Sequence, residues 1–80
     1  MIRVVAFGRV RELLGFGERE FDFPGGGTVG VLRGRLERDV PELASLRDST
    51  RIACNGALVD DQAQLRDGDE VALLPPVGGG

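Results

Sequence analysis

The chain has 80 residues, of which 41% are apolar and 29% charged, so it can form one small domain with a modest core. Cys54 is the only cysteine and there is no histidine, which excludes an intrachain disulfide, a Ser/His or Cys/His nucleophile and a zinc-type site. The 10 basic residues are all arginine, so no side-chain amine is available for Schiff-base chemistry. With a net charge of −3 and no long apolar run, we expect a soluble cytoplasmic protein without nucleic-acid or membrane partners.

The first third of the chain reads as two strands. Residues 2–7 are rich in apolar and β-branched side chains and predict a strand that Gly8 ends. Residues 9–17 are polar around a central pair of leucines, which favours a loop or a single helical turn. Residues 18–23 end in alternation, so Phe21 and Phe23 should point inward from a second strand, antiparallel to the first.

A helix is predicted over residues 29–39. Thr28 follows three glycines and is a favourable N-cap, and Pro41 ends the helix. The apolar side chains recur at spacings of three and four and form one stripe: Val29, Leu32, Leu36 and Val40. Charged residues, Arg33 among them, occupy the other faces.

The remainder of the chain predicts three short strands. Residues 51–55 and 57–59 flank Asn55-Gly56, a strong hairpin-turn signal. A polar connection follows, in which Leu65 should fill the core. Asp67-Gly68 marks a second turn before the last strand, residues 70–74.

The element order is therefore β-β-α-β-β-β, without repeats or linkers. This order fits an α+β fold of the β-grasp (ubiquitin-like) type, with a mixed four- to five-stranded sheet packed on one main helix. A ferredoxin-like sandwich would need a second full helix, for which the sequence has no good candidate. We expect one domain over residues 1–74 and an extended tail over residues 75–80.

Both terminal strands carry apolar residues on both of their faces. One helix can cover only one face of a sheet, so the second face should meet something else. We expect a protein partner to dock there, near the C-terminal end, with Phe7, Leu58 and Leu74 in the contact. The alternative is that these are scattered exposed apolar residues, which are common on soluble domains.

The last six residues carry the strongest functional signal. Pro75 and Pro76 remove two backbone donors, so the chain must leave the sheet there in an extended conformation. Gly78, Gly79 and Gly80 have no side chains and can thread a narrow channel. The carboxylate of Gly80 is a poor electrophile, but adenylation by an ATP-using partner would turn it into a mixed anhydride that sulfide or a thiolate can attack. The alternative is a frayed glycine-rich end without a role.

Three motifs extend this signal over nearly the whole chain. They are Val10-Arg11-Glu12-Leu13 after the first strand, Leu65-Arg66-Asp67-Gly68-Asp69-Glu70-Val71 before the last strand, and Pro-Pro-Val-Gly-Gly-Gly at the end. With them, the chain resembles the molybdopterin synthase sulfur-carrier (small) subunit family of ubiquitin-like proteins. Gly78 departs from the alanine, serine or threonine that the family often has at this position.

The resemblance implies a role in molybdenum cofactor biosynthesis. It implies that an E1-like adenylyltransferase uses ATP to adenylate Gly80, and that a sulfur donor such as a cysteine desulfurase/rhodanese system converts Gly80 to a thiocarboxylate. The thiocarboxylate supplies sulfur to cyclic pyranopterin monophosphate in the active site of the large subunit, into which Gly78 and Gly79 insert, typically within a heterotetramer. The chain would then be no enzyme by itself and would bind no cofactor or metal. The expected partner interface comprises Phe7, Arg11, Leu58, Leu74, Pro75, Pro76 and Val77.

Several alternatives remain open on the sequence. The carrier chemistry could serve thiamine, cysteine or tRNA thiolation, the tail could join Gly80 to lysines of target proteins, or the domain could be an interaction module with an idle tail. The glycines before Thr28 invite a phosphate-loop interpretation, but the Gly-Lys-Ser/Thr ending is missing, so we expect a connecting turn. We expect Cys54 to be a small buried residue and the acidic turns to be solvated rather than metal sites.

Overall fold

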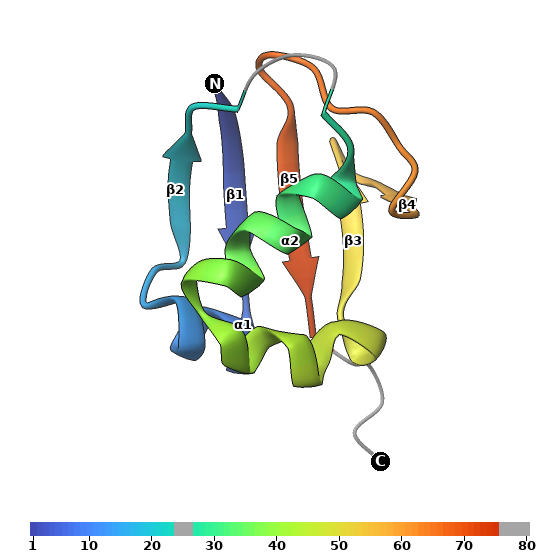
Figure 1. Cartoon of the computed structure of the whole chain (residues 1–80). Coiled ribbons are helices and arrows are strands. Elements are labelled where there is room, and N and C mark those ends of the chain that lie inside the picture. The colour runs from blue at the N-terminus through green and yellow to red at the C-terminus, as the bar shows by residue number, and fades with distance from the viewer. Residues whose placement is uncertain (24–26, 76–80) are drawn as a thin grey trace.

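A computed structural model describes residues 1–23 and 27–75 of the chain (Figure 1). Its elements, in chain order, are β1 (Ile2–Ala6), α1 (Gly8–Leu14), β2 (Glu18–Phe21), α2 (Val29–Asp39), the 3-10 segment η1 (Pro41–Ser49), β3 (Arg51–Cys54), β4 (Ala57–Val59) and β5 (Glu70–Leu74). Among the described residues, no helix is both long and apolar enough to cross a membrane.

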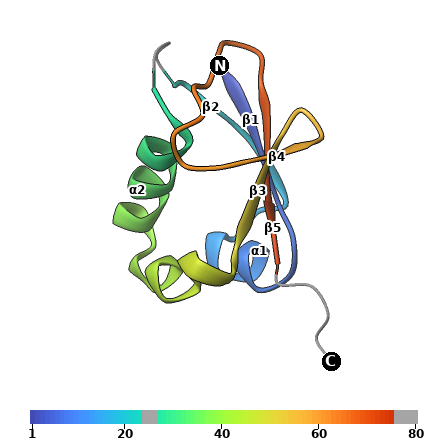
Figure 2. The same ribbon diagram turned by 90° about the vertical axis from the view of Figure 1, so that its right-hand side faces the viewer.

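The five strands form one mixed sheet in the order β2-β1-β5-β3-β4. The first and last strands lie side by side and parallel, with Val4 opposite Val71 and Ala6 opposite Leu73. All other strand pairs are antiparallel. Helix α2 crosses one face of this sheet, and the opposite face carries no helix (Figures 1 and 2). The predicted β-grasp fold is confirmed.

The core lies between α2 and the sheet. Helix α2 begins at its predicted cap, where the Thr28 hydroxyl accepts a hydrogen bond from the Val31 N–H at 3.2 Å. Val29, Leu32 and Leu36 of the predicted stripe are buried. They meet the inward residues of the strands, which alternate as a period of two requires: Ile2, Val4, Ala6, Ile52, Val71 and Leu73. Phe21, Phe23 and Leu65 are also buried, as predicted.

The connection between β4 and β5 closes over the start of α2. The N–H groups of Val29 and Gly30 donate to the carbonyls of Ala63 and Asp61, each at 2.9 Å. A Cβ on Gly30 would lie 3.2 Å from the Asp61 carbonyl oxygen, so the close approach favours glycine in spite of its cost in helix propensity. This connection therefore satisfies the helix terminus and places Leu65 in the core.

Two helical segments differ from the prediction. Residues 8–14 form α1 rather than a loop or a single turn, and Gly15 ends it with φ +82°. The signal was present, because Val10, Leu13 and Leu14 have helical spacing and pack on the core. Residues 41–49 form η1, which starts at Pro41 and buries Leu43; the sequence analysis predicted only that Pro41 ends the preceding helix.

Arg33, which was predicted only to lie off the apolar stripe of α2, has a side chain that is only 14% exposed. Its guanidinium donates to the carbonyls of Arg47 and Thr50, each at 2.9 Å, which ties α2 to the end of η1. Its Nε lies 2.9 Å from Oδ1 of Asp61, in a geometry that makes an ion pair without a hydrogen bond. Arg47 in turn donates to Glu37 and to Asp61, each at 2.9 Å.

Asn55 and Asp69 join the two turns at one end of the sheet. Asn55 has φ +51° in the predicted turn. Its side-chain oxygen accepts a hydrogen bond from the Glu70 N–H at 3.0 Å, and its side-chain amide donates one to the Asp69 carboxylate at 2.9 Å. The Asp69 carboxylate also accepts from the Arg66 N–H at 2.8 Å. The backbone bond from Arg66, and then the bond from Asn55, lower the pKa of Asp69 below its ordinary value.

We predict that Arg33→Lys lowers the free energy of unfolding by about 2 kcal/mol, because lysine cannot make the two hydrogen bonds to the Arg47 and Thr50 carbonyls and the ion pair with Asp61 at the same time. For a domain of this size the melting temperature should fall by about 10 °C. Arg38→Lys, on the exposed face of the same helix, is the matched control and should change neither quantity. Equal stability of the two variants in thermal unfolding would contradict the assignment of Arg33.

We predict that the free energy of unfolding depends on pH through the titration of the Asp69 carboxylate. Because its pKa is lowered in the folded state, its contribution is present above the unfolded pKa of about 4 and is lost as the pH falls through the folded pKa. Asp69→Asn should cost about 1 kcal/mol near neutral pH, and the difference from the wild type should shrink below about pH 4. Urea unfolding at several pH values measures this. Asp48→Asn, an exposed position, is the control; a pH-independent deficit in Asp69→Asn would contradict the prediction.

Candidate functional site

The parallel pairing of β1 with β5 brings the end of β5 to the start of α1. Ala6 is opposite Leu73, so Phe7 and Gly8 come beside Leu74 and Pro75 as both strands end. Gly8 has φ +58°, and a Cβ built on it would lie 3.2 Å from Cβ of Pro75. Pro75 is half-buried in this contact. The chain therefore leaves the sheet next to Phe7, at the end remote from Met1 (Figure 1).

The uncovered face of the sheet carries an apolar surface that runs to this exit. Register places Val5 opposite Ala72, Ala72 opposite Ala53 and Ala53 opposite Leu58, all on the face without a helix (Figure 2). Phe7 is 44% exposed and Leu58 62% exposed, while Leu74 is half-buried. We call the set the outer-face patch: Val5, Phe7, Ala53, Leu58, Ala72 and Leu74. The structure thus places the three predicted contact residues Phe7, Leu58 and Leu74 on one face.

Charged residues border the outer-face patch on the side away from the exit. Arg3 pairs with Glu18 at 3.2 Å and with Glu70 at 3.5 Å. At the exit itself, Arg51 lies opposite Leu74 and is exposed. An apolar centre with a polar border is the usual anatomy of a protein-binding surface.

Arg11, which the sequence analysis also assigned to the interface, follows the patch residue Phe7 by one helical turn, and its N–H donates to the Phe7 carbonyl at 3.3 Å. It is exposed on α1, and its guanidinium folds back over Gly17, where a Cβ would be 3.0 Å from the guanidinium carbon. Pro76, Val77, Gly78, Gly79 and Gly80 lie outside the described residues. Their roles rest on the sequence and stay predictions.

The phosphate-loop interpretation does not fit the start of α2. The first three N–H groups of the helix, those of Val29, Gly30 and Val31, already donate to Ala63, Asp61 and Thr28. These are the groups that would bind an anion at a helix N-terminus, so none of the three is free for a phosphate. Residues 24–26, in the glycine run before them, lie outside the described part of the chain.

Cys54 and the carboxylates of the acidic turn make contacts that serve the fold. The thiol is half-buried on the face that α2 covers, and burial, followed by the nearby Asp69, raises its pKa above the ordinary value. Asp67 pairs with the amino group of Met1, and Asp69 accepts the hydrogen bonds already described. Over residues 1–23 and 27–75, no group of three or more cysteine or carboxylate side chains is placed to hold a metal ion.

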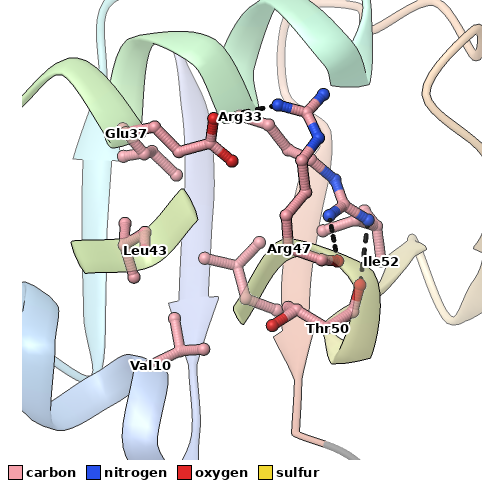
Figure 3. Close-up of a pocket in the computed structure, with 9 residues that line it drawn as sticks. Val10, Arg33, Glu37, Leu43, Arg47, Thr50 and Ile52 are labelled. Carbon is pink, nitrogen blue, oxygen red and sulfur yellow. Dashed lines mark hydrogen bonds and ion pairs between the residues drawn. The ribbon is translucent and has the colours of Figure 1, made fainter. Parts of the chain in front are cut away.

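A hollow between α2, η1 and the sheet is too small for a substrate (Figure 3). Its volume is about 30 Å³, and its lining is mostly apolar, with Arg33, Arg47 and Thr50 among its walls. Sites for small molecules usually measure several hundred Å³. The hollow is therefore a packing gap that could hold at most a water molecule.

Comparison with known proteins finds relatives over the full length of the chain. The model of the ThiS family matches residues 4–80. The molybdopterin synthase sulfur carrier subunit of Escherichia coli (strain K12) is 43% identical over 84 residues, which cover 100% of both chains. The protein of the same name from Chlamydomonas reinhardtii is 35% identical over 81 residues, which cover 99% of this chain and 98% of the relative.

Solved structures give the same result. A putative molybdopterin converting factor, subunit 1, from Pyrococcus furiosus superposes with a TM-score of 0.84 at 30% identity, covering 95% of this chain and 97% of the other. Small archaeal modifier protein 1 from Methanosarcina acetivorans gives 0.83 at 26% identity, covering 99% and 95%. A chain from the complex of subunits 1 and 2 of molybdopterin-converting factor from Helicobacter pylori gives 0.69 at 28% identity, covering 99% and 97%. The chain therefore belongs to the ThiS family, together with sulfur carrier subunits of molybdopterin synthase.

Proposed function

We propose that this protein is the sulfur carrier, or small, subunit of molybdopterin synthase. The observation that carries the proposal is the outer-face patch, which ends where β5 ends and the segment leading to Gly80 begins. A partner docked on this patch would receive the glycines directly into its own active site. Full-length similarity to sulfur carrier subunits from a bacterium and an alga supports the same function.

Gly80 carries the chemistry in this proposal. An E1-like adenylyltransferase uses ATP to form a mixed anhydride between the Gly80 carboxylate and AMP, and releases pyrophosphate. A sulfur donor, such as a cysteine desulfurase/rhodanese system, then presents a protein persulfide whose terminal sulfur displaces AMP. A thiol reduces the S–S bond of the resulting acyl disulfide and leaves the Gly80 thiocarboxylate. The thiocarboxylate donates its sulfur to cyclic pyranopterin monophosphate, and two such deliveries build the dithiolene. Water restores the carboxylate of Gly80 after each one.

The catalytic groups belong to the large subunit in this proposal. The carrier supplies the docking surface and the tail, whose residues Gly78 and Gly79 insert into the active site of the large subunit. It binds no cofactor of its own. Pro75, Pro76 and Val77 lead from the sheet into the tail and contact the partner together with Phe7, Arg11, Leu58 and Leu74. The similarity to a chain from the complex of subunits 1 and 2 supports the pairing with a large subunit. Two copies of each subunit would form a heterotetramer in the cytoplasm.

A second candidate is a ubiquitin-like modifier that joins Gly80 to an amine of a target protein. The similarity to small archaeal modifier protein 1 favours it, since the same adenylate can be attacked by an amine. Carriers for thiamine, cysteine or tRNA thiolation share the activation step and differ in the acceptor. Analysis of the acceptor that takes the acyl group or the sulfur separates these functions.

Docking on the outer-face patch predicts an unequal effect of two alanine substitutions. Leu58→Ala should weaken binding to the large subunit by about tenfold or more, because an exposed apolar side chain would be buried on docking. Val31→Ala, which removes a side chain 58% exposed on α2, should leave the affinity within about twofold. Titration calorimetry with the purified large subunit measures both. Equal affinities for the two variants would place the interface elsewhere.

The carrier chemistry predicts a mass change at Gly80. After incubation with the E1-like enzyme, ATP and a sulfur donor, the intact protein should gain the mass difference between sulfur and oxygen, located in the C-terminal peptide by fragmentation. Deletion of Gly79 and Gly80 should abolish this gain without a change in the melting temperature, because both residues lie beyond β5. An unchanged mass, with the enzyme shown to be active on another carrier, would exclude a sulfur carrier role for Gly80.

A further inference from the structure

An activated C-terminus is exposed to any nucleophile of its own chain, and the residues of this chain that could attack it are few. All ten basic residues are arginines, whose guanidinium stays protonated and is no nucleophile near neutral pH. Three of the four hydroxyl side chains donate hydrogen bonds to carbonyls of η1 (Ser45, Ser49 and Thr50), and the fourth, that of Thr28, caps α2. A hydroxyl without a neighbouring base reacts poorly. Two competent nucleophiles remain: the α-amine of Met1 and the thiol of Cys54.

Both remaining nucleophiles lie beside one acidic turn at the start of β5, and the chain leaves the sheet at the other end of that strand. The amino group of Met1 pairs with Asp67, and the Gly68 N–H donates to the Met1 carbonyl at 2.7 Å. Cys54 lies opposite Val71, one residue into β5, and next to Asp69. Pro75 follows the opposite end of the same strand, directly after Leu74.

The length of the tail reinforces this separation. Along β1, from Met1 to Phe7 beside the exit, the chain runs six residues, which is about 20 Å in extended conformation. The five residues after Pro75 can span about 17 Å at most. Gly80 therefore falls short of its own α-amine. The Cys54 thiol is nearer, but it is half-buried on the face of the sheet that α2 covers.

The acidic turn also lowers the reactivity of both groups. The hydrogen bond to Asp67 raises the pKa of the Met1 α-amine, so a larger fraction is protonated near neutral pH. Burial and then Asp69 raise the pKa of the Cys54 thiol, which lowers the thiolate fraction. Only the unprotonated amine and the thiolate attack an acyl group.

We propose that this domain is inert toward its own activated C-terminus. The chain has no lysine, and Met1 and Cys54 are held beside the Asp67–Asp69 turn, so only external acceptors can react with Gly80. This inference rests on the proposed activation of Gly80. The reaction that is avoided forms a C–N bond between an amine and the Gly80 carbonyl carbon, breaks the C–O bond to AMP and releases AMP and a proton. The product would be a cyclic chain or a self-conjugate that can no longer carry sulfur.

The test restores an amine at each end of the sheet by the same conservative substitution. Arg51→Lys places it opposite Leu74 at the exit, and Arg66→Lys places it in the turn near Met1. Each full-length protein is prepared with Gly80 as a small-molecule thioester and incubated at mildly alkaline pH, and intact mass separates two products. Hydrolysis gives the free acid, whereas self-acylation gives a chain lighter than the acid by one water, or a covalent dimer.

We expect the wild type and Arg66→Lys to give the free acid. Arg51→Lys should give at least about tenfold more of the lighter product, because a tail that spans the gap presents the amine at millimolar effective concentration. Three results would overturn the proposal. The wild type could acylate itself as fast as Arg51→Lys, the two variants could give equal amounts of the lighter product, or Arg51→Lys could give no cyclic product. Pyrophosphate release with the E1-like enzyme and ATP is measured separately, so a failure of activation is distinguished from a failure of this inference.

Discussion

The parallel pairing of β1 with β5 is the constraint on which the arrangement of the molecule depends. It places the first and the last strand side by side within the sheet, and both strands end on the same side of it. Because they are parallel, the residue after β1 and the residue after β5 become neighbours, although they are separated by most of the chain. Phe7, Gly8 and Pro75 meet for this reason.

Everything packed on the other face holds this pairing in place. Helix α2 buries its apolar stripe on the central strands, and Arg33 fixes α2 to the end of η1, immediately before β3. The connection from β4 to β5 covers the N-terminus of the same helix. One face is thereby filled from within the chain, and the outer-face patch stays available to a partner beside the exit of β5. The fold thus keeps its stabilising contacts on one face and leaves uncovered the face on which we propose that a partner docks.

The sequence predicted the strands, α2 and its cap, because each carries a local signal: alternation, a hairpin turn at Asn55-Gly56, and Thr28 before an apolar stripe. Phe7, Leu58 and Leu74 were predicted from strand alternation to share a face, and the register of the strand pairs places them on one face. Helix α1 was underestimated because two glycines shorten its pattern, and η1 has a repeat too tight for a search at helical spacing. The burial of Arg33 could not be predicted, since its carbonyl partners come from residues 47 and 50, which only the fold brings to α2.

The central claim is that Gly80 hands sulfur to an acceptor bound by a partner that docks on the outer-face patch. A single-turnover experiment tests it most directly. The protein is loaded with radiolabelled sulfur as the Gly80 thiocarboxylate, freed of the activating enzyme, and mixed with the large subunit and cyclic pyranopterin monophosphate. The account predicts that the label leaves the protein and appears in the dithiolene product, and that this transfer requires the large subunit. Label that stays on Gly80, or leaves it equally fast without the large subunit, would contradict the account.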